Sequence, residues 1–131
     1  MILLDTHTFL WLCLEPKRLS RLATLAIREA ATAGGIVIAS ISLWEIAMLV
    51  SLGRISPHGM TENWLSELIE TSGVIVKEIT PAVAVLSTQL PRDFPADPAD
   101  RMIAATARAE GLRLVTRDTG IRASKLVNTV W

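Results

Sequence analysis

The sequence predicts an α/β fold in three layers (α/β/α), with helices on both faces of a central, mainly parallel sheet. Short apolar runs of strand length alternate along the chain with longer segments whose apolar residues recur at helical spacing. The short runs show no alternation of apolar and polar residues, which is typical of strands that helices cover on both faces. With 131 residues and no repeat or linker, the chain is expected to form a single domain over residues 1–131.

The strands are predicted from the apolar runs and from the turn residues that bound them. Four runs have the length and composition of buried strands, and a fifth, near the end of the chain, is expected to be an edge strand. The predicted strands cover residues 1–5, 36–39, 74–79, 112–116 and 126–130.

The helices are predicted from apolar periodicity and from residues that cap helix ends. Thr6 and Thr80 are expected to cap helix N-termini, and Gly53 and Gly73 are expected to end helices. The predicted helices cover residues 6–14, 20–33, 42–52, 61–72 and 98–110, with further helical segments after residues 80 and 118.

Composition and charge restrict the class of protein. Half of the residues are hydrophobic and a fifth are charged, which predicts that another chain covers part of the surface. Thirteen basic and thirteen acidic residues balance, so the chain lacks the positive excess that indicates nucleic-acid binding. A lone cysteine, the absence of a secretory signal and the absence of an apolar run of ~20 residues predict a cytoplasmic protein that is not embedded in a membrane.

Four acidic residues from distant parts of the chain are expected at one edge of the sheet. Asp5 ends the first predicted strand, and Asp118 lies just past the fourth. Glu45 and Asp100 are expected in the first turns of helices that begin near the same edge, outside the carboxyl ends of the strands, where such sheets bind ligands. Because clustered carboxylates repel one another unless a cation or protons neutralise them, we expect a divalent metal among these acids.

The residue types favour Mg²⁺ or Mn²⁺ and hydrolysis of a phosphodiester. Mg²⁺ prefers oxygen ligands and is commonly held by carboxylates together with substrate phosphate. His7, His58 and Cys13 are scattered and do not form a zinc-binding set. Neither a serine or cysteine nucleophile with a partner base nor a GxxxxGK phosphate loop is present. The expected chemistry is therefore attack of metal-activated water on the phosphodiester.

Four segments occur in order over almost the whole chain: LLDTH, SISLWEIA, DPADRMIAATA and LVTRD. Together they resemble the ordered acidic motifs of PIN domains, and in particular those of VapC-type toxins. The resemblance implies a PIN-like fold and a Mg²⁺- or Mn²⁺-dependent endoribonuclease that cleaves RNA as the toxin of a type II toxin–antitoxin pair. It also implies a homodimer and a small antitoxin protein that inhibits the enzyme by placing a peptide near the site.

Carried over residue by residue, the resemblance implies that Asp5, Glu45 and Asp100 hold the metal and that Asp118 is the fourth acid of the catalytic set. Thr116 matches a position that lines the site. Each acid also has a structural interpretation: Asp100 and Asp118 suit the start of a helix or turn, and Glu45 could pair with a basic residue. An acid that closes a buried strand, as Asp5 does, is disfavoured unless something binds it.

Neighbouring residues have two interpretations. Thr6 and Asp97 are candidates to line the site, although Asp97 is also well placed to cap the helix that follows. Arg101 and Arg117 adjoin the acids and either balance them or contact phosphate. Beyond Arg92 and Arg101, few basic residues surround the DPADR segment, which leaves the RNA-binding surface undefined.

Trp11, Trp44 and Trp64 occur at helical spacing, which favours core positions, although one or two of them could line a partner groove.

Two other functions are consistent with part of the pattern. Aspartate-nucleophile phosphatases also place an acid after the first strand, but their chemistry needs a second aspartate where this chain has His7. A catalytically idle PIN-fold interaction module would be expected to have lost one of the four acids, and all four are present.

Overall fold

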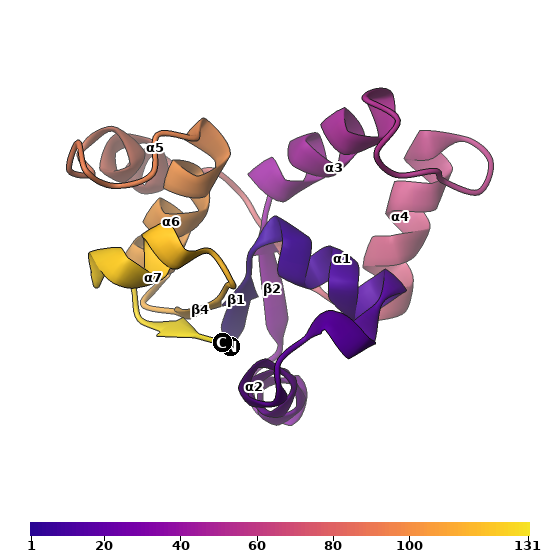
Figure 1. Ribbon diagram of the computed structural model, residues 1–131, viewed down its shortest axis with the longest axis horizontal. Helices are drawn as coiled ribbons and strands as arrows, with labels where there is room; N and C mark the ends of the chain where they lie inside the picture. The colour runs from indigo at the N-terminus through magenta and orange to yellow at the C-terminus, as the bar shows by residue number, and fades with distance from the viewer.

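A computed structural model describes residues 1–131 as a parallel sheet of five strands enclosed by helices (Figure 1). The spatial order of the strands is β3-β2-β1-β4-β5, and every neighbouring pair is parallel. This arrangement confirms the three-layer α/β/α fold. The strands are β1 (Ile2–Leu4), β2 (Ile36–Ala39), β3 (Ile75–Lys77), β4 (Arg113–Val115) and β5 (Thr129–Val130).

The path of the chain creates a switch point beside the central strand. From β1 the chain passes through α1 and α2 to β2, then through α3 and α4 to β3. It then returns to the other side of β1, where α5 and α6 lead to β4 and α7 leads to β5. In such sheets the crevice at the switch point is where ligands bind, so the carboxyl ends of β1 and β4 are the expected site.

The helices follow the order expected from their apolar periodicity. They are α1 (Thr6–Leu14), α2 (Arg21–Thr32), α3 (Ile41–Ser51), α4 (Thr61–Ser72), α5 (Pro81–Thr88), α6 (Pro98–Glu110) and α7 (Thr119–Ser124), with a short 3₁₀ helix η1 (Pro16–Arg18). The Thr80 hydroxyl accepts a hydrogen bond from the Val83 amide and so caps α5, as predicted. None of these helices is long and apolar enough to cross a membrane.

The core has one cluster on each face of the sheet because alternate strand residues point to opposite faces. Ile2 and Leu4 pack on the face that α1 to α4 cover, together with Ile38 of β2. Leu3 and Val37 pack on the opposite face, which α6 and α7 cover. In Figure 1, α6 and α7 accordingly lie on one side of the strands, and α1 and α4 lie on the other.

Several predicted boundaries are wrong in detail. Four of the strands are shorter than the apolar runs that predict them, because these runs continue past the residues that pair in the sheet: the first strand, for example, covers residues 2–4 rather than 1–5. The N-cap of α1 is Asp5, not Thr6, since a side-chain oxygen of Asp5 accepts the hydrogen bond from the Thr8 amide. Gly53, with φ of +73°, comes one residue after the C-cap of α3.

Glu45 lies in the second turn of α3 rather than the first. The helix begins at Ile41, one residue earlier than predicted, and Ser40 is its N-cap. Ser42 is therefore the second residue of the helix, and its hydroxyl forms a hydrogen bond with Thr6 across the fold. Glu45 lies on the face of α3 that looks toward the start of α1, where it accepts a hydrogen bond from Thr6.

Candidate active site

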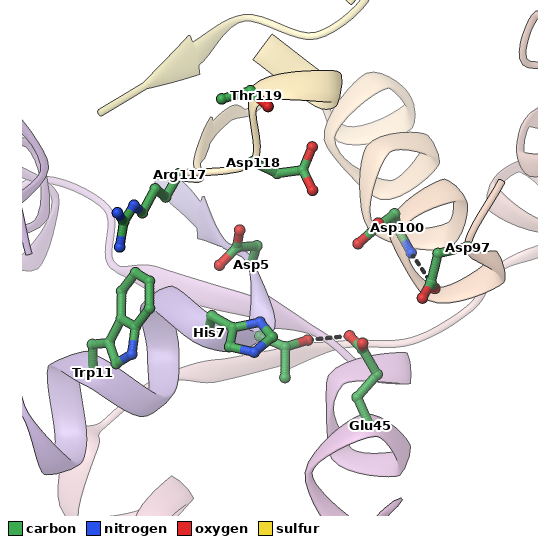
Figure 2. Close-up of a pocket in the computed structure, with 10 residues that line it drawn as sticks. Asp5, His7, Trp11, Glu45, Asp97, Asp100, Arg117, Asp118 and Thr119 are labelled. Carbon is green, nitrogen blue, oxygen red and sulfur yellow. Dashed lines mark hydrogen bonds between the residues drawn. The ribbon is translucent and has the colours of Figure 1, made fainter. Parts of the chain in front are cut away.

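A polar cleft of about 470 Å³ opens at the carboxyl ends of β1 and β4, at the switch point of the sheet. All four predicted acids line it: Asp5 after β1, Glu45 from α3, Asp100 from α6 and Asp118 before α7. Figure 2 shows these carboxylates arranged around one shared space. The remaining lining residues are Thr6, His7, Trp11, Asp97, Arg117 and Thr119.

Asp5 lies at the base of the cleft and is only 9% exposed. Its Oδ1 accepts a hydrogen bond of 2.7 Å from the Thr8 amide, and its Oδ2 accepts one from the Thr116 hydroxyl. The Asp5 amide donates to the Val115 carbonyl of β4 at 3.1 Å, which extends the β1–β4 pairing to the edge of the cleft. The neighbouring strand therefore fixes both the backbone and the carboxylate of Asp5.

Glu45 is held by a pair of buried hydroxyl groups. The Thr6 hydroxyl donates a hydrogen bond to Glu45 Oε1, and Thr6 Oγ1 lies 2.9 Å from the hydroxyl oxygen of Ser42. Because Thr6 has one hydroxyl proton, Ser42 is the donor in the second bond. Burial raises the pKa of Glu45, the bond from Thr6 opposes that rise, and the charges of Asp97 and Asp5 add to it.

Asp100 has the most perturbed carboxyl group in the cleft. Burial raises its pKa from 3.8 to about 7, and the neighbouring charges of Asp97, Asp118, Glu45 and Asp5 contribute to the rise. A carboxyl group with such a pKa is partly protonated at neutral pH when no cation compensates the cluster. Perturbation of this kind is common at functional sites.

Asp97 and Asp118 combine a lining position with a capping role. Asp97 Oδ1 accepts hydrogen bonds from the amides of Ala99 and Asp100, at 2.8 and 3.3 Å, so the predicted helix cap is present at the rim of the cleft. Asp118 Oδ1 accepts from the Ile121 amide at 2.9 Å and caps α7. Both carboxylates are thus held in place by helix N-termini.

Thr116 and Gly120 support the cleft from beneath. Thr116 is fully buried, and its Oγ1 accepts a hydrogen bond from the Asp118 amide at 3.1 Å while its proton is donated to Asp5. At Gly120 an added Cβ would lie 3.0 Å from Pro95 and 3.2 Å from Asp118 Oδ1. A side chain at position 120 would therefore crowd Asp118.

Arg101 does not line the cleft, although it is adjacent to Asp100 in sequence. Its guanidinium donates to the carbonyls of Leu90, Pro91 and Phe94 at 3.1 to 3.4 Å and lies 5.8 Å from the Phe94 ring centroid. Its role is to hold the loop before α6. Arg117, the other basic candidate, does line the cleft.

Sequence reasoning did not assign three lining residues to the cleft, His7, Trp11 and Thr119, nor Ser42, which contacts Thr6 behind the lining. His7 and Trp11 are four residues apart, so they share a face of α1, and this spacing was the signal available in the sequence. The contact of Ser42 with Thr6 spans 36 residues, and no local pattern predicts it.

The donor set fits a hydrated hard cation. Five carboxylates and a single guanidinium line the cleft, so its charge is strongly negative. No three acidic, histidine or cysteine side chains are arranged to bind one ion directly. Mg²⁺ usually keeps several waters and takes only one or two carboxylates, so an ion in this cleft would contact the other acids through water.

The fold, with its acidic cleft at the switch point, matches a known family. The family model of the PIN domain matches residues 2–125, so the chain belongs to the PIN-domain family. Among curated proteins it is similar to Ribonuclease VapC22 of Mycobacterium tuberculosis, with 41% identity over 99% of this chain and 98% of that protein.

Solved structures show the same fold. FitAcB from Neisseria gonorrhoeae has 27% identity and a TM-score of 0.64, and the match covers 98% of this chain and 96% of that chain. VapBC2 from Rickettsia felis, solved with a DNA fragment from its promoter, has 20% identity and a TM-score of 0.72, over 98% of this chain and 97% of that chain.

Proposed function

We propose that this chain is a Mg²⁺- or Mn²⁺-dependent endoribonuclease that acts as the toxin of a VapBC-like toxin–antitoxin pair. The observation that carries the proposal is the convergence of Asp5, Glu45, Asp100 and Asp118, from four separate elements, on one cleft. The 41% identity to Ribonuclease VapC22 over nearly the whole length supports RNA as the substrate.

The four acids would hold the cation, and the hydroxyl groups behind them would fix their orientation. When bound, a divalent cation lowers the pKa of a water and offsets negative charge on the phosphate. Thr116 and the Thr8 amide hold the two oxygens of Asp5, and Thr6 holds Glu45. Preorganised acids of this kind need little rearrangement when substrate binds.

Asp100 and Arg117 have different parts in this scheme. Asp100, with a pKa of about 7, gives up its proton near neutral pH when a cation takes the proton's place. Arg117 is the only guanidinium in the lining, so it is the group placed to bind a non-bridging oxygen of the phosphate.

The hydrogen bonds to the Asp5 carboxylate argue against Asp5 as a nucleophile. Both of its carboxylate oxygens accept hydrogen bonds from the protein, and no second aspartate stands two residues later, where the phosphatase chemistry needs one. These contacts suit a fixed ligand better than an attacking group.

The test is cleavage of an end-labelled single-stranded RNA by the purified chain, with Mg²⁺ and then with excess EDTA. We expect cleavage only with the metal. Because water and not the 2′-hydroxyl attacks, we expect products without a 2′,3′-cyclic phosphate. Cleavage that persists in EDTA, or cyclic products, would contradict the proposal, and an idle interaction module would leave the RNA intact.

We further propose that the protein forms a homodimer through α3 and binds a small antitoxin. Trp44 and Met48 of α3 and its C-cap Leu52 are spaced four residues apart, so they form one stripe along the helix, and they are 56%, 39% and 60% exposed. Exposed apolar stripes of this kind are typical of protein–protein contacts. The similarity to VapBC2 and FitAcB supports a partner protein for this chain.

A further inference from the structure

A second, smaller hollow adjoins the acidic cleft along α1. Its volume is about 240 Å³, and it shares His7 and Trp11 with the cleft, so the two are continuous. Its floor is apolar and consists of Leu10, Leu14, Leu49 and Ile55. Sites that enclose drug-sized ligands are roughly 300–1,000 Å³. This hollow is smaller than those sites, so it suits a smaller group, of the size of one nucleobase.

Two arginines and one acid stand around this hollow. Arg18 and Arg54 line it, and both are exposed. Glu15 lies 4.0 Å from Arg18, but both side chains are about half exposed or more, at 63% and 49%. An exposed pair at this distance is weak, so it leaves the Arg18 guanidinium available to another anion.

Trp11 lies between the guanidinium of Arg117 in the cleft and that of Arg18 in the hollow. The Arg18 guanidinium lies 4.6 Å from the Trp11 ring centroid, and the Arg117 guanidinium lies 6.0 Å from the same ring. Figure 2 shows Arg117 next to Trp11 at the edge of the cleft, away from Asp97 and Asp100. A row of positive charge therefore leads from the cleft across Trp11 to the hollow.

Electrostatics favours binding of a polyanion along this row of arginines. The lining of the cleft contains five carboxylates, so a strand that binds there needs cations beside it. Arg101 cannot supply one, because its guanidinium is engaged by the carbonyls of the loop before α6. The balanced total charge of the chain makes local placement of cations more important.

We propose that this hollow, named here the α1–α3 subsite, binds the nucleotide next to the scissile phosphate of single-stranded RNA. The base enters between the apolar residues of the floor, and Arg18 and Arg54 bind the phosphates that flank it. Arginine binds phosphate through its fork of donors, and its planar face also stacks on bases. This subsite rests on the proposed function, since it positions RNA for the acidic cleft.

The test measures binding of a fluorescein-labelled 12-mer of single-stranded RNA, by anisotropy, to the full-length Asp5→Asn chain with Mg²⁺. In that background the Arg18→Ala/Arg54→Ala pair should weaken binding tenfold or more. It should also flatten the slope of log K against log salt by about 1.4, because each lost phosphate contact contributes roughly 0.7 for single strands. The matched control is Arg108→Ala/Arg113→Ala, which removes the same charge from a separate hollow that contains neither His7 nor Trp11; it should change the affinity less than twofold.

A conservative pair, Arg18→Lys/Arg54→Lys, keeps both positive charges and controls for a folding defect at these positions. It should preserve most of the dependence of log K on log salt. Unchanged RNA affinity in the alanine pair would overturn the subsite, and if the wild-type chain still cleaves RNA with Mg²⁺, the nuclease proposal stands. Unchanged RNA affinity combined with loss of binding to a partner protein would assign the hollow to a peptide and would also overturn it. A wild-type chain that neither binds nor cleaves RNA would overturn both proposals.

Discussion

Replacement of Asp100 by asparagine is expected to stabilise the metal-free protein at pH 8. Burial and neighbouring acids raise the pKa of Asp100 from 3.8 to about 7, and a shift of about three units corresponds to about 4 kcal/mol. Because the side chain is only half buried, solvent screening reduces this to about 2 kcal/mol. Loss of negative charge at the N-terminus of α6 costs about 0.3–1 kcal/mol, so the net gain is about 1 kcal/mol, or about 3–5 °C in Tm.

The pH dependence has a defined sign. Since the pKa of Asp100 is raised in the folded state, the native protein binds the proton more tightly than the unfolded chain does. The contribution of Asp100 to stability is therefore fully present below about pH 4 and is lost as the pH rises through about 7. Between pH 8 and pH 5.5 the parent should gain about 1 kcal/mol in EDTA after screening. The raised pKa of Glu45 acts in the same direction and leaves a smaller dependence in the variant.

The assay is urea denaturation of both proteins in EDTA at pH 8 and pH 5.5. Asp93→Asn is the matched control, because Asp93 is an exposed acid in the loop before α6 and does not line the cleft. The control should leave the pH dependence of the parent unchanged. If Asp100→Asn destabilises the protein at pH 8, or keeps the full pH dependence of the parent, burial and the neighbouring acids do not raise the pKa of Asp100 as described.

Three further predictions concern residues around the cleft and on the surface. Thr6→Val should lower the single-turnover cleavage rate about tenfold or more because Glu45 loses the hydroxyl that orients it. Thr6→Ser should retain most of the rate, and equal rates for Thr6→Val and the parent would refute the role of the hydroxyl. Trp44→Arg should convert the proposed dimer to a monomer in light scattering, and an unchanged dimer mass would place the dimer contact elsewhere. Cys13, whose pKa burial raises to about 11, should resist alkylation at pH 8 until the protein is unfolded in urea, and rapid labelling of the native protein would contradict this.

The gathering of the acids could be predicted because it depends on local signals. An apolar run ending in Asp5 and another ending just before Asp118 fix where two strands stop, and parallel pairing brings their carboxyl ends to one edge. The start of α6 after Asp97 follows from capping and from the proline behind it. Such features are set by a few consecutive residues.

The misplaced and missing residues depend on contacts between distant segments. Arg101 was a candidate for the site because it follows Asp100, but three loop carbonyls turn its guanidinium away. Ser42 was expected to begin α3, but the helix begins at Ile41, and the bond of Ser42 to Thr6, 36 residues away, has no local signal. The α1–α3 subsite requires the end of α3 to lie beside α1, which periodicity within either helix cannot predict.

The central claim is that the acidic cleft binds the cation with which the protein hydrolyses RNA, and cleavage by Asp5→Asn tests it most directly. Asparagine keeps an oxygen that can accept the hydrogen bond from the Thr8 amide, so the metal-free fold should be as stable as the parent or slightly more stable. Single-turnover cleavage with Mg²⁺ should nevertheless fall by a factor on the order of a hundred or more, since one of the acids that hold the ion is lost. Cleavage near the parental rate by Asp5→Asn, or a variant that unfolds in EDTA, would contradict the claim.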